Sequence, residues 1–311
     1  MKNLFKLFRA ENLLFIIFIQ YAMRFFIIKP ILENHNINIL FSEFNFGLLV
    51  LTTVILAASG YLINNYFDAE LDEKAGKNVV IGKSISKKSA MNIYVFMNIV
   101  AIAIGFYISY LVGIYKIGFI FVIISGLLWF YSSAYKKMFL IGNLIIALMA
   151  AMVPFTIVLF EIPLQYDINK EILLTRGQNL NDIIFWLAGF GGFAFIMTLI
   201  REIIKDIEDF DGDMAFNANT LPIILGEKTA KFIVTFLTLI TIAAIGIISF
   251  KFLTNTSTII YVILLIILPL IFLIVKNFMA KNSKDFHFLS TFTKLIMIAG
   301  VLYSVVAYLN F

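Results

Sequence analysis

The sequence predicts an all-α, polytopic membrane protein that folds as a bundle of nine transmembrane helices. Of its 311 residues, 61% are hydrophobic and only 14% are charged, and the mean hydropathy is +0.98. No soluble globular domain approaches this composition. The chain contains no cysteine, which excludes disulfides, thiolate metal sites and a cysteine nucleophile.

Each predicted helix corresponds to an apolar stretch long enough to cross roughly 30 Å of hydrocarbon. These stretches are 12–30, 46–66, 94–112, 117–135, 139–160, 183–203, 232–250, 257–275 and 290–309. Very short connections join the third, fourth and fifth stretches, so we expect these helices to be antiparallel neighbours.

Positive charge predicts the orientation, because cytoplasmic loops retain lysine and arginine. An N-terminus inside the cell places most of the 24 basic residues in cytoplasmic segments. We therefore expect a multi-pass protein of the cell membrane with a cytoplasmic N-terminus, an external C-terminus and a cytoplasmic active site. The net charge of +5 follows from this topology and from attraction to anionic headgroups, and gives no support for nucleic-acid binding.

No glycine- or serine-rich linker divides the chain, so we expect one membrane domain over residues 1–311. Its longer connections, 67–93 and 204–231, are expected to be cytoplasmic cap loops. The first carries five lysines, and a basic cap suits an anionic substrate.

Two series of oxygen-bearing side chains stand at the ends of long apolar stretches. They are Asn64, Asp68 and Asp72, and Glu202, Asp206, Asp209 and Asp213. Spacings of three and four residues stack such side chains along one face of a helix. An isolated charge at a helix end often only marks the water interface. Two regular carboxylate series instead favour Mg²⁺, which takes oxygen ligands and is commonly shared with a substrate phosphate.

The two series also carry a resemblance to a family. NNYFDAELD and DIEDFDGD resemble the two acidic motifs of the UbiA-type intramembrane prenyltransferases. Further matching residues are Tyr131, Ser132, Lys136, Lys137, Gly142, Asn143, Thr220, Leu221, Pro222 and Gly226. The resemblance spans about residues 60–230 and implies nine helices around a central substrate cavity.

The resemblance implies transfer of an isoprenyl group from its diphosphate to a lipophilic acceptor in the bilayer, with two Mg²⁺ ions and no obligatory protein partner. It implies that Asn64, Asp68 and Asp72 hold one side of the metal-diphosphate, and Asp206, Asp209 and Asp213 the other. Asp68, Asp72, Asp206 and Asp209 are then the catalytic set. Substrate-binding candidates beside Asn64 are Lys77, Lys83, Tyr131, Lys136, Lys137, Lys205 and Glu202.

One segment departs from the family pattern. Many members continue after the first motif with an arginine- and proline-rich stretch, whereas this chain reads EKAGKNVVIGKSISKK. Lysine binds phosphate as a point charge but lacks the bidentate guanidinium fork. The departure leaves open whether the lysine-rich cap binds diphosphate, and leaves the expected metal ligands unchanged.

The acceptor is predicted from the second series, REIIKDIEDFDGD, which is most similar to family members that alkylate the free hydroxyl of a prenylated glycerol phosphate. This predicts geranylgeranyl transfer to geranylgeranylglyceryl phosphate. An aromatic acceptor of quinone biosynthesis is the alternative within the family. A cation-coupled transporter and a catalytically silent scaffold are the alternatives of other classes.

Three further charged or titratable residues carry separate expectations. Arg24 lies within the first predicted span near Lys29, and we expect its side chain to extend to the membrane interface. His35 and His287 are expected to lie in loops with no catalytic role.

Overall fold

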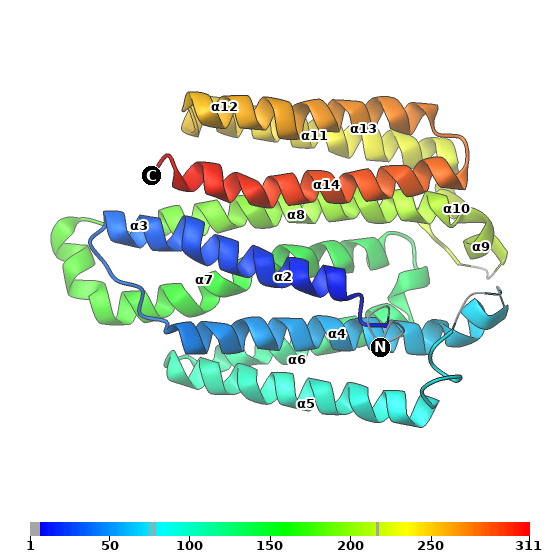
Figure 1. Ribbon diagram of the computed structural model, residues 1–311, viewed down its shortest axis with the longest axis horizontal. Coiled ribbons are helices and arrows are strands. Elements are labelled where there is room, and N and C mark those ends of the chain that lie inside the picture. Colours follow the sequence, from blue (N-terminus) through cyan, green and yellow to red (C-terminus); the bar gives the residue numbers. More distant parts are fainter. Residues whose placement is uncertain (1–6, 75, 77–78, 216–217) are drawn as a thin grey trace. The chain divides into compact units, whose positions relative to one another are not determined.

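The computed structural model describes residues 7–74, 76, 79–215 and 218–311. Nine helices in this described part are long and apolar enough to cross a membrane, which confirms the predicted spans (Figure 1). They are Ala10–Asn34, Glu43–Glu70, Lys87–Leu111, Tyr115–Ser133, Ile141–Arg176, Asn181–Glu208, Glu227–Phe252, Thr256–Met279 and Ser283–Tyr308.

Several of these spans are built from more than one helical segment. The segments are α2 (Ala10–Met23), η1 (Arg24–Ile28), α3 (Lys29–Asn34), α4 (Glu43–Lys74), α5 (Lys87–Leu111), η2 (Tyr115–Gly118), α6 (Phe119–Ser133), η3 (Tyr135–Lys137), α7 (Ile141–Arg176), α8 (Asn181–Glu208), α9 (Phe210–Ala215), α10 (Leu221–Leu225), α11 (Glu227–Phe252), α12 (Thr256–Val262), η4 (Ile263–Ile267), α13 (Leu268–Met279) and α14 (Ser283–Tyr308).

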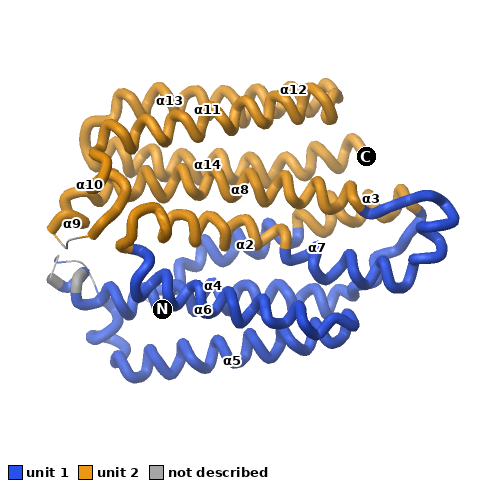
Figure 2. Tube along the Cα trace, turned by 180° about the vertical axis from the view of Figure 1, so that it is seen from behind, with its two compact units in different colours: residues 1–21, 36–136, 156–180 blue, residues 22–35, 137–155, 181–311 orange. Residues whose placement is uncertain are grey.

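The chain divides into two compact units, which are coloured separately in Figure 2. The first unit comprises Met1–Tyr21, Asn36–Lys136 and Thr156–Leu180, and the second comprises Ala22–His35, Lys137–Phe155 and Asn181–Phe311. The single membrane domain expected from the sequence stays a prediction.

In the first unit, α4 packs against α5 and α6. Leu62 and Ile63 of α4 share a core with Tyr94 of α5 and Trp129 of α6. Glycine permits close contact between these helices, because a Cβ added at Gly60 would lie 3.1 Å from the Leu128 side chain. Such small residues at helix contacts are typical of membrane bundles. This packing fixes α4, which carries the first acidic series.

In the second unit, α8 packs against α11 and α14, and α13 contacts both of those helices. Ile200, Ile203 and Ile204 of α8 are central to this core. A Cβ at Gly191 of α8 would lie 3.1 Å from the carbonyl oxygen of Ala151, so the first part of α7 approaches α8 closely. This packing fixes α8, which carries the second acidic series.

Two of the described spans contain a π-helical turn, and each turn ends two residues before a proline. Arg24–Ile28 comes before Pro30, and Ile263–Ile267 comes before Pro269. Proline lacks the N–H for an i→i−4 bond, and its ring crowds the preceding turn. A wider π turn accommodates this mismatch without ending the helix.

The structure corrects the expectation for Arg24, which begins the first π turn. Arg24 is only 1% exposed, so its side chain does not extend to the membrane interface. Lys29, five residues further along, is exposed and pairs with Glu33 at 3.8 Å.

The two expected cap loops are largely helical. In the first, α4 continues to Lys74, and α5 begins at Lys87 with Ser86 as its N-cap. In the second, α8 continues to Glu208, and the short helices α9 and α10 lead to α11. His287 lies in α14 rather than in a loop, and its Nδ1 is 2.8 Å from Glu208 Oε1.

Candidate active site

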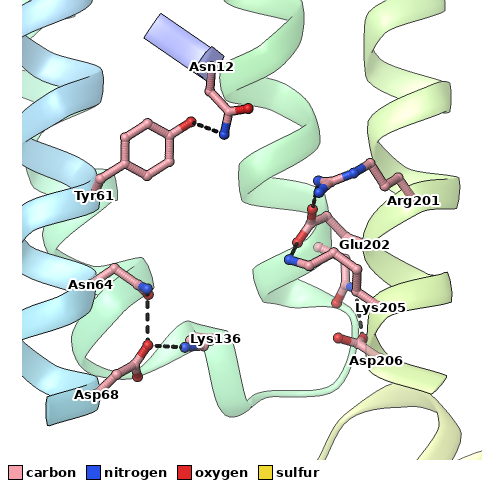
Figure 3. A network of polar contacts seen from close by, with 10 residues as sticks. Asn12, Tyr61, Asn64, Asp68, Lys136, Arg201, Glu202, Lys205 and Asp206 are labelled. Carbon is pink, nitrogen blue, oxygen red and sulfur yellow. Dashed lines mark hydrogen bonds and ion pairs between the residues drawn. The ribbon is translucent and has the colours of Figure 1, made fainter. Parts of the chain in front are cut away.

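The first acidic series lies in the last turns of α4. Asn64 donates a hydrogen bond from its amide nitrogen to Asp68 Oδ2 at 3.0 Å, as the four-residue spacing predicts. The ammonium of Lys136, from η3, forms an ion pair with the same oxygen (Figure 3). The first unit therefore brings together an amide, a carboxylate and a lysine that the sequence had placed in the substrate site.

The oxygen atoms of this group fit a divalent cation. The side-chain amide oxygen of Asn64, Oδ1, is buried and has no hydrogen-bond partner among the described residues. A buried acceptor without a partner lowers the stability of the fold, and a bound ligand that interacts with the acceptor removes this penalty. Asp68 supplies a carboxylate beside it. Mg²⁺ takes only one or two protein carboxylates and fills its remaining positions with water and phosphate oxygens, so this donor set suits it.

Side chains from the start of the chain support α4 just before the series. Asn12 donates to the Tyr61 hydroxyl at 3.1 Å, and the Arg9 guanidinium lies over the Tyr61 ring at 5.2 Å. Asn65 donates to the carbonyl oxygen of Leu7 at 3.3 Å. These contacts, which the sequence patterns did not indicate, hold the turn that carries Asn64.

The described part of the first unit contains three more of the predicted site residues, Asp72, Tyr131 and Lys83. Asp72 and Tyr131 are half-buried. Lys83, from the cap segment, is exposed and pairs with Glu73 of α4 at 3.2 Å. Lys77 lies outside the described residues, so its predicted role stays a prediction.

The second acidic series begins with Glu202, which lies in α8 between two cations. Glu202 Oε1 accepts from Arg201 Nη1 at 2.7 Å, and Glu202 Oε2 accepts from Lys205 Nζ at 3.2 Å (Figure 3). Glu202 and Lys205 were predicted together as substrate-binding residues. Arg201 was not, although its place inside an apolar span is a signal for function.

Asp206 follows one turn after Glu202, and its partner comes from α7. The Asn143 amide donates to Asp206 Oδ2 at 2.8 Å. Asn143 is 8% exposed, and no other side chain of the described residues hydrogen-bonds to Asp206. Each unit thus contains an aspartate whose carboxylate is oriented by an asparagine. Asn143 is one of the residues that match the family, but its contact with Asp206 was not predicted from the sequence.

The helical path of α8 continues beyond Asp206. The Asp209 amide donates to the Lys205 carbonyl at 2.9 Å, and the Asp213 amide donates to the Asp209 carbonyl at 2.9 Å. Asp209 is exposed and Asp213 is half-buried. Lys137 is exposed, and its carbonyl oxygen accepts from the amide of Asn219 at 2.9 Å.

The two series belong to different units. Within the described residues, no three aspartate, glutamate or histidine side chains gather as they would around one metal ion. The described side chains therefore do not by themselves form a complete coordination shell for a metal ion.

Comparison with known proteins identifies the chain. The profile of the UbiA prenyltransferase family matches residues 37–296, which is most of the chain. The chain belongs to the UbiA prenyltransferase family. It is therefore a multi-pass membrane enzyme that transfers prenyl groups, and the transporter and silent-scaffold alternatives are wrong.

Relatives of known name support this membership. The chain is 32% identical to digeranylgeranylglyceryl phosphate synthase of Methanosphaera stadtmanae over 251 residues, which cover 80% of this chain and 82% of the relative. It is 31% identical to the protein of the same name from Methanobrevibacter smithii over 257 residues, covering 81% and 82%.

Solved structures show the same fold. A structure reported for digeranylgeranylglyceryl phosphate synthase in membranes matches with a TM-score of 0.66 and 23% identity, covering 100% of this chain and 99% of the other. The apo structure of a UbiA homolog from Aeropyrum pernix K1 matches with a TM-score of 0.64 and 14% identity, covering 93% and 96%. At these identities the likeness concerns the fold.

Proposed function

We propose that this enzyme transfers a geranylgeranyl group from its diphosphate to the free hydroxyl of geranylgeranylglyceryl phosphate. The observation that carries the proposal is identity of about 30% with digeranylgeranylglyceryl phosphate synthases over four-fifths of the chain. The second acidic series, REIIKDIEDFDGD, favours the same acceptor. The product would be an ether lipid with two geranylgeranyl chains.

We place the reaction at the cytoplasmic face of the membrane. Spans with an even number run in the same direction, so the second and sixth spans end at the same face. The acidic series occupy the last turns of those two spans. The distribution of lysine and arginine assigns that face to the cytoplasm.

The donor site would contain Mg²⁺, most simply two ions. Asn64, Asp68 and Asp72 would hold one side and Asp206, Asp209 and Asp213 the other, as the family resemblance implies. Bound Mg²⁺ would neutralise the diphosphate and so favour cleavage of the allylic C–O bond. The unpaired Asn64 oxygen and the carboxylates oriented by asparagine support this assignment.

Lys136 would exchange partners during the reaction. In the free enzyme its ammonium pairs with Asp68. Divalent charge at Asp68 would compete for that carboxylate, and Lys136 would then bind an oxygen of the diphosphate. A positive charge at the leaving group stabilises the negative charge that grows on it as the bond breaks.

The transfer itself balances without a further reactant. The bond between C1 of the geranylgeranyl group and the diphosphate oxygen breaks, and the electron pair leaves with the diphosphate. The acceptor hydroxyl oxygen forms a bond to C1. Its proton passes to the released diphosphate or to a nearby base, giving the ether and diphosphate.

A comparison of acceptors tests the proposal. Purified enzyme is given radiolabelled geranylgeranyl diphosphate and Mg²⁺ with either geranylgeranylglyceryl phosphate or 4-hydroxybenzoate. We expect labelled product only with the glyceryl phosphate. Product with the aromatic acid alone would refute the proposed acceptor and assign the enzyme to quinone chemistry.

A further inference from the structure

Two cations in α8 share one carboxylate. Arg201 and Lys205 each contact a different oxygen of Glu202, so the three side chains carry one net positive charge. Both cations are half-buried, since the Arg201 side chain is 17% exposed and that of Lys205 is 30% exposed. An unbalanced charge within a membrane span is expensive and is usually retained for function. Asp206, one turn further along α8, interacts electrostatically with Lys205 and Glu202 but not with Arg201, so the Arg201 end of the cluster is where positive charge favours an anionic ligand.

The same face of α8 has hydrogen-bond donors that are not used. The Nε of Arg201 and the hydroxyl of Thr198 are both buried, and neither has a partner among the described residues. Thr198 is 5% exposed and precedes Arg201 by three residues, a spacing that makes side chains neighbours on a helix. Burial without a partner is unfavourable for both groups. A ligand that accepts hydrogen bonds from both would remove this penalty.

We propose that Arg201, Lys205 and Thr198 bind the phosphate group of the acceptor; this rests on the proposed function. A phosphate monoester offers several acceptor oxygens to a guanidinium fork, an ammonium and a hydroxyl. Glu202 is then a positioning residue that holds both cations.

The position along α8 favours the acceptor over the donor diphosphate. Arg201 lies five residues before Asp206, which is about 7.5 Å along a helix axis, and Thr198 lies further away still, whereas Lys205 directly precedes Asp206. The aspartates expected to serve the donor continue beyond Asp206, away from Arg201 and Thr198. The acceptor has to bring a second phosphate near the reacting carbon. That second anion needs cations of its own.

The test uses one acceptor with its phosphate and one without. Initial rates are measured for the full-length enzyme with geranylgeranylglyceryl phosphate and with geranylgeranylglycerol, at saturating geranylgeranyl diphosphate and Mg²⁺. The variants are Arg201→Gln, Arg201→Lys and Thr198→Val, with Arg176→Gln at the far end of α7 as the matched control. The KM of the donor is measured in parallel.

We expect Arg201→Gln to raise the KM of the phosphorylated acceptor roughly ten- to a hundredfold, the loss of a charged hydrogen bond. The KM values of geranylgeranylglycerol and of the donor should not change. Arg201→Lys should have a smaller effect because it keeps the charge and loses the fork. Arg176→Gln should behave as wild type.

Thr198→Val covers the case in which Arg201→Gln fails to fold. It removes a hydroxyl that has no partner in the described structure, so the unfolding temperature should be unchanged or higher. The KM of the phosphorylated acceptor should still rise several-fold. An unchanged KM would overturn the proposed phosphate site.

Other outcomes are equally decisive. An equal loss with both acceptors in Arg201→Gln would make Arg201 purely structural, and a rise in the donor KM would assign it to the diphosphate; either overturns the inference. A wild-type enzyme inactive with both glycerol acceptors would refute the proposed function itself. A wild-type preference for the phosphorylated acceptor that survives in Arg201→Gln would refute only the phosphate site.

Discussion

The hydrogen bond between Asn143 and Asp206 provides a quantitative test of the site in the second unit. Asn143→Leu replaces the amide by an apolar side chain of similar size, so it removes the hydrogen bond without leaving a large cavity. The lost bond is 2.8 Å long and ends on a carboxylate. Hydrogen bonds to charged groups are worth about 1.5–3 kcal/mol. A loss of this size in the transition state lowers the rate roughly 10- to 150-fold.

The assay separates this effect from a loss of stability. Turnover at saturating substrates and the Mg²⁺ concentration for half-maximal rate are measured together with the unfolding temperature in detergent. The matched control is Asn98→Leu in the first unit. Asn98 is 7% exposed, donates to the Tyr94 carbonyl at 2.8 Å and accepts from Ser125 at 2.6 Å, so this variant also loses buried hydrogen bonds.

We expect both variants to unfold at a lower temperature, but only Asn143→Leu to lose turnover by the amount calculated above and to need more Mg²⁺. The reasoning is refuted if Asn143→Leu keeps wild-type turnover and Mg²⁺ dependence. It is also refuted if Asn98→Leu loses as much turnover as Asn143→Leu, because the defect would then be one of folding.

Two more predictions concern the first unit. Lys136→Gln should lower turnover by roughly 10²-fold, the usual result of removing one group that stabilises developing negative charge. The control is Lys88→Gln, which changes an exposed lysine at the start of α5 and should keep wild-type turnover. Equal rates for the two variants would exclude a role for Lys136 at the leaving group. Gly105→Ala should destabilise the fold by about 1–3 kcal/mol, because its Cβ would lie 2.1 Å from the ring of Phe121, which is 1% exposed. Gly126→Ala has open space around its Cβ and should be neutral or stabilising in thermal unfolding; an unfolding temperature lowered equally in both would contradict the packing.

The spans could be predicted from hydropathy, but their ends could not. The predicted fifth span ended at residue 160, whereas α7 continues to Arg176. Polar residues lower the hydropathy of this extension, yet their side chains are paired along the helix. Gln165 donates to Glu161 at 2.8 Å and Asn169 donates to Gln165 at 2.9 Å. Hydropathy records that these residues are polar but not that they are hydrogen-bonded to one another.

The contacts within a helix could also be predicted, whereas those between helices could not. The pair Asn64–Asp68 follows from four-residue spacing and the pair Glu202–Lys205 from three-residue spacing. Lys136 was selected by family resemblance, and its pairing with Asp68 depends on how η3 approaches α4. Asn143 reaches Asp206 only because α7 packs closely on α8. Arg24 is buried at the start of a π turn, and neither the turn nor the burial was indicated by residue spacing.

The central claim is that both acidic series serve one Mg²⁺-dependent transfer. The most direct measurement is the single-turnover rate of Asp68→Asn and Asp206→Asn with geranylgeranyl diphosphate and geranylgeranylglyceryl phosphate, beside wild type. These substitutions remove one negative charge each and preserve side-chain size. We predict that transfer falls below detection in both variants while the unfolding temperature shows that the fold persists. Wild-type transfer in either variant would contradict the claim.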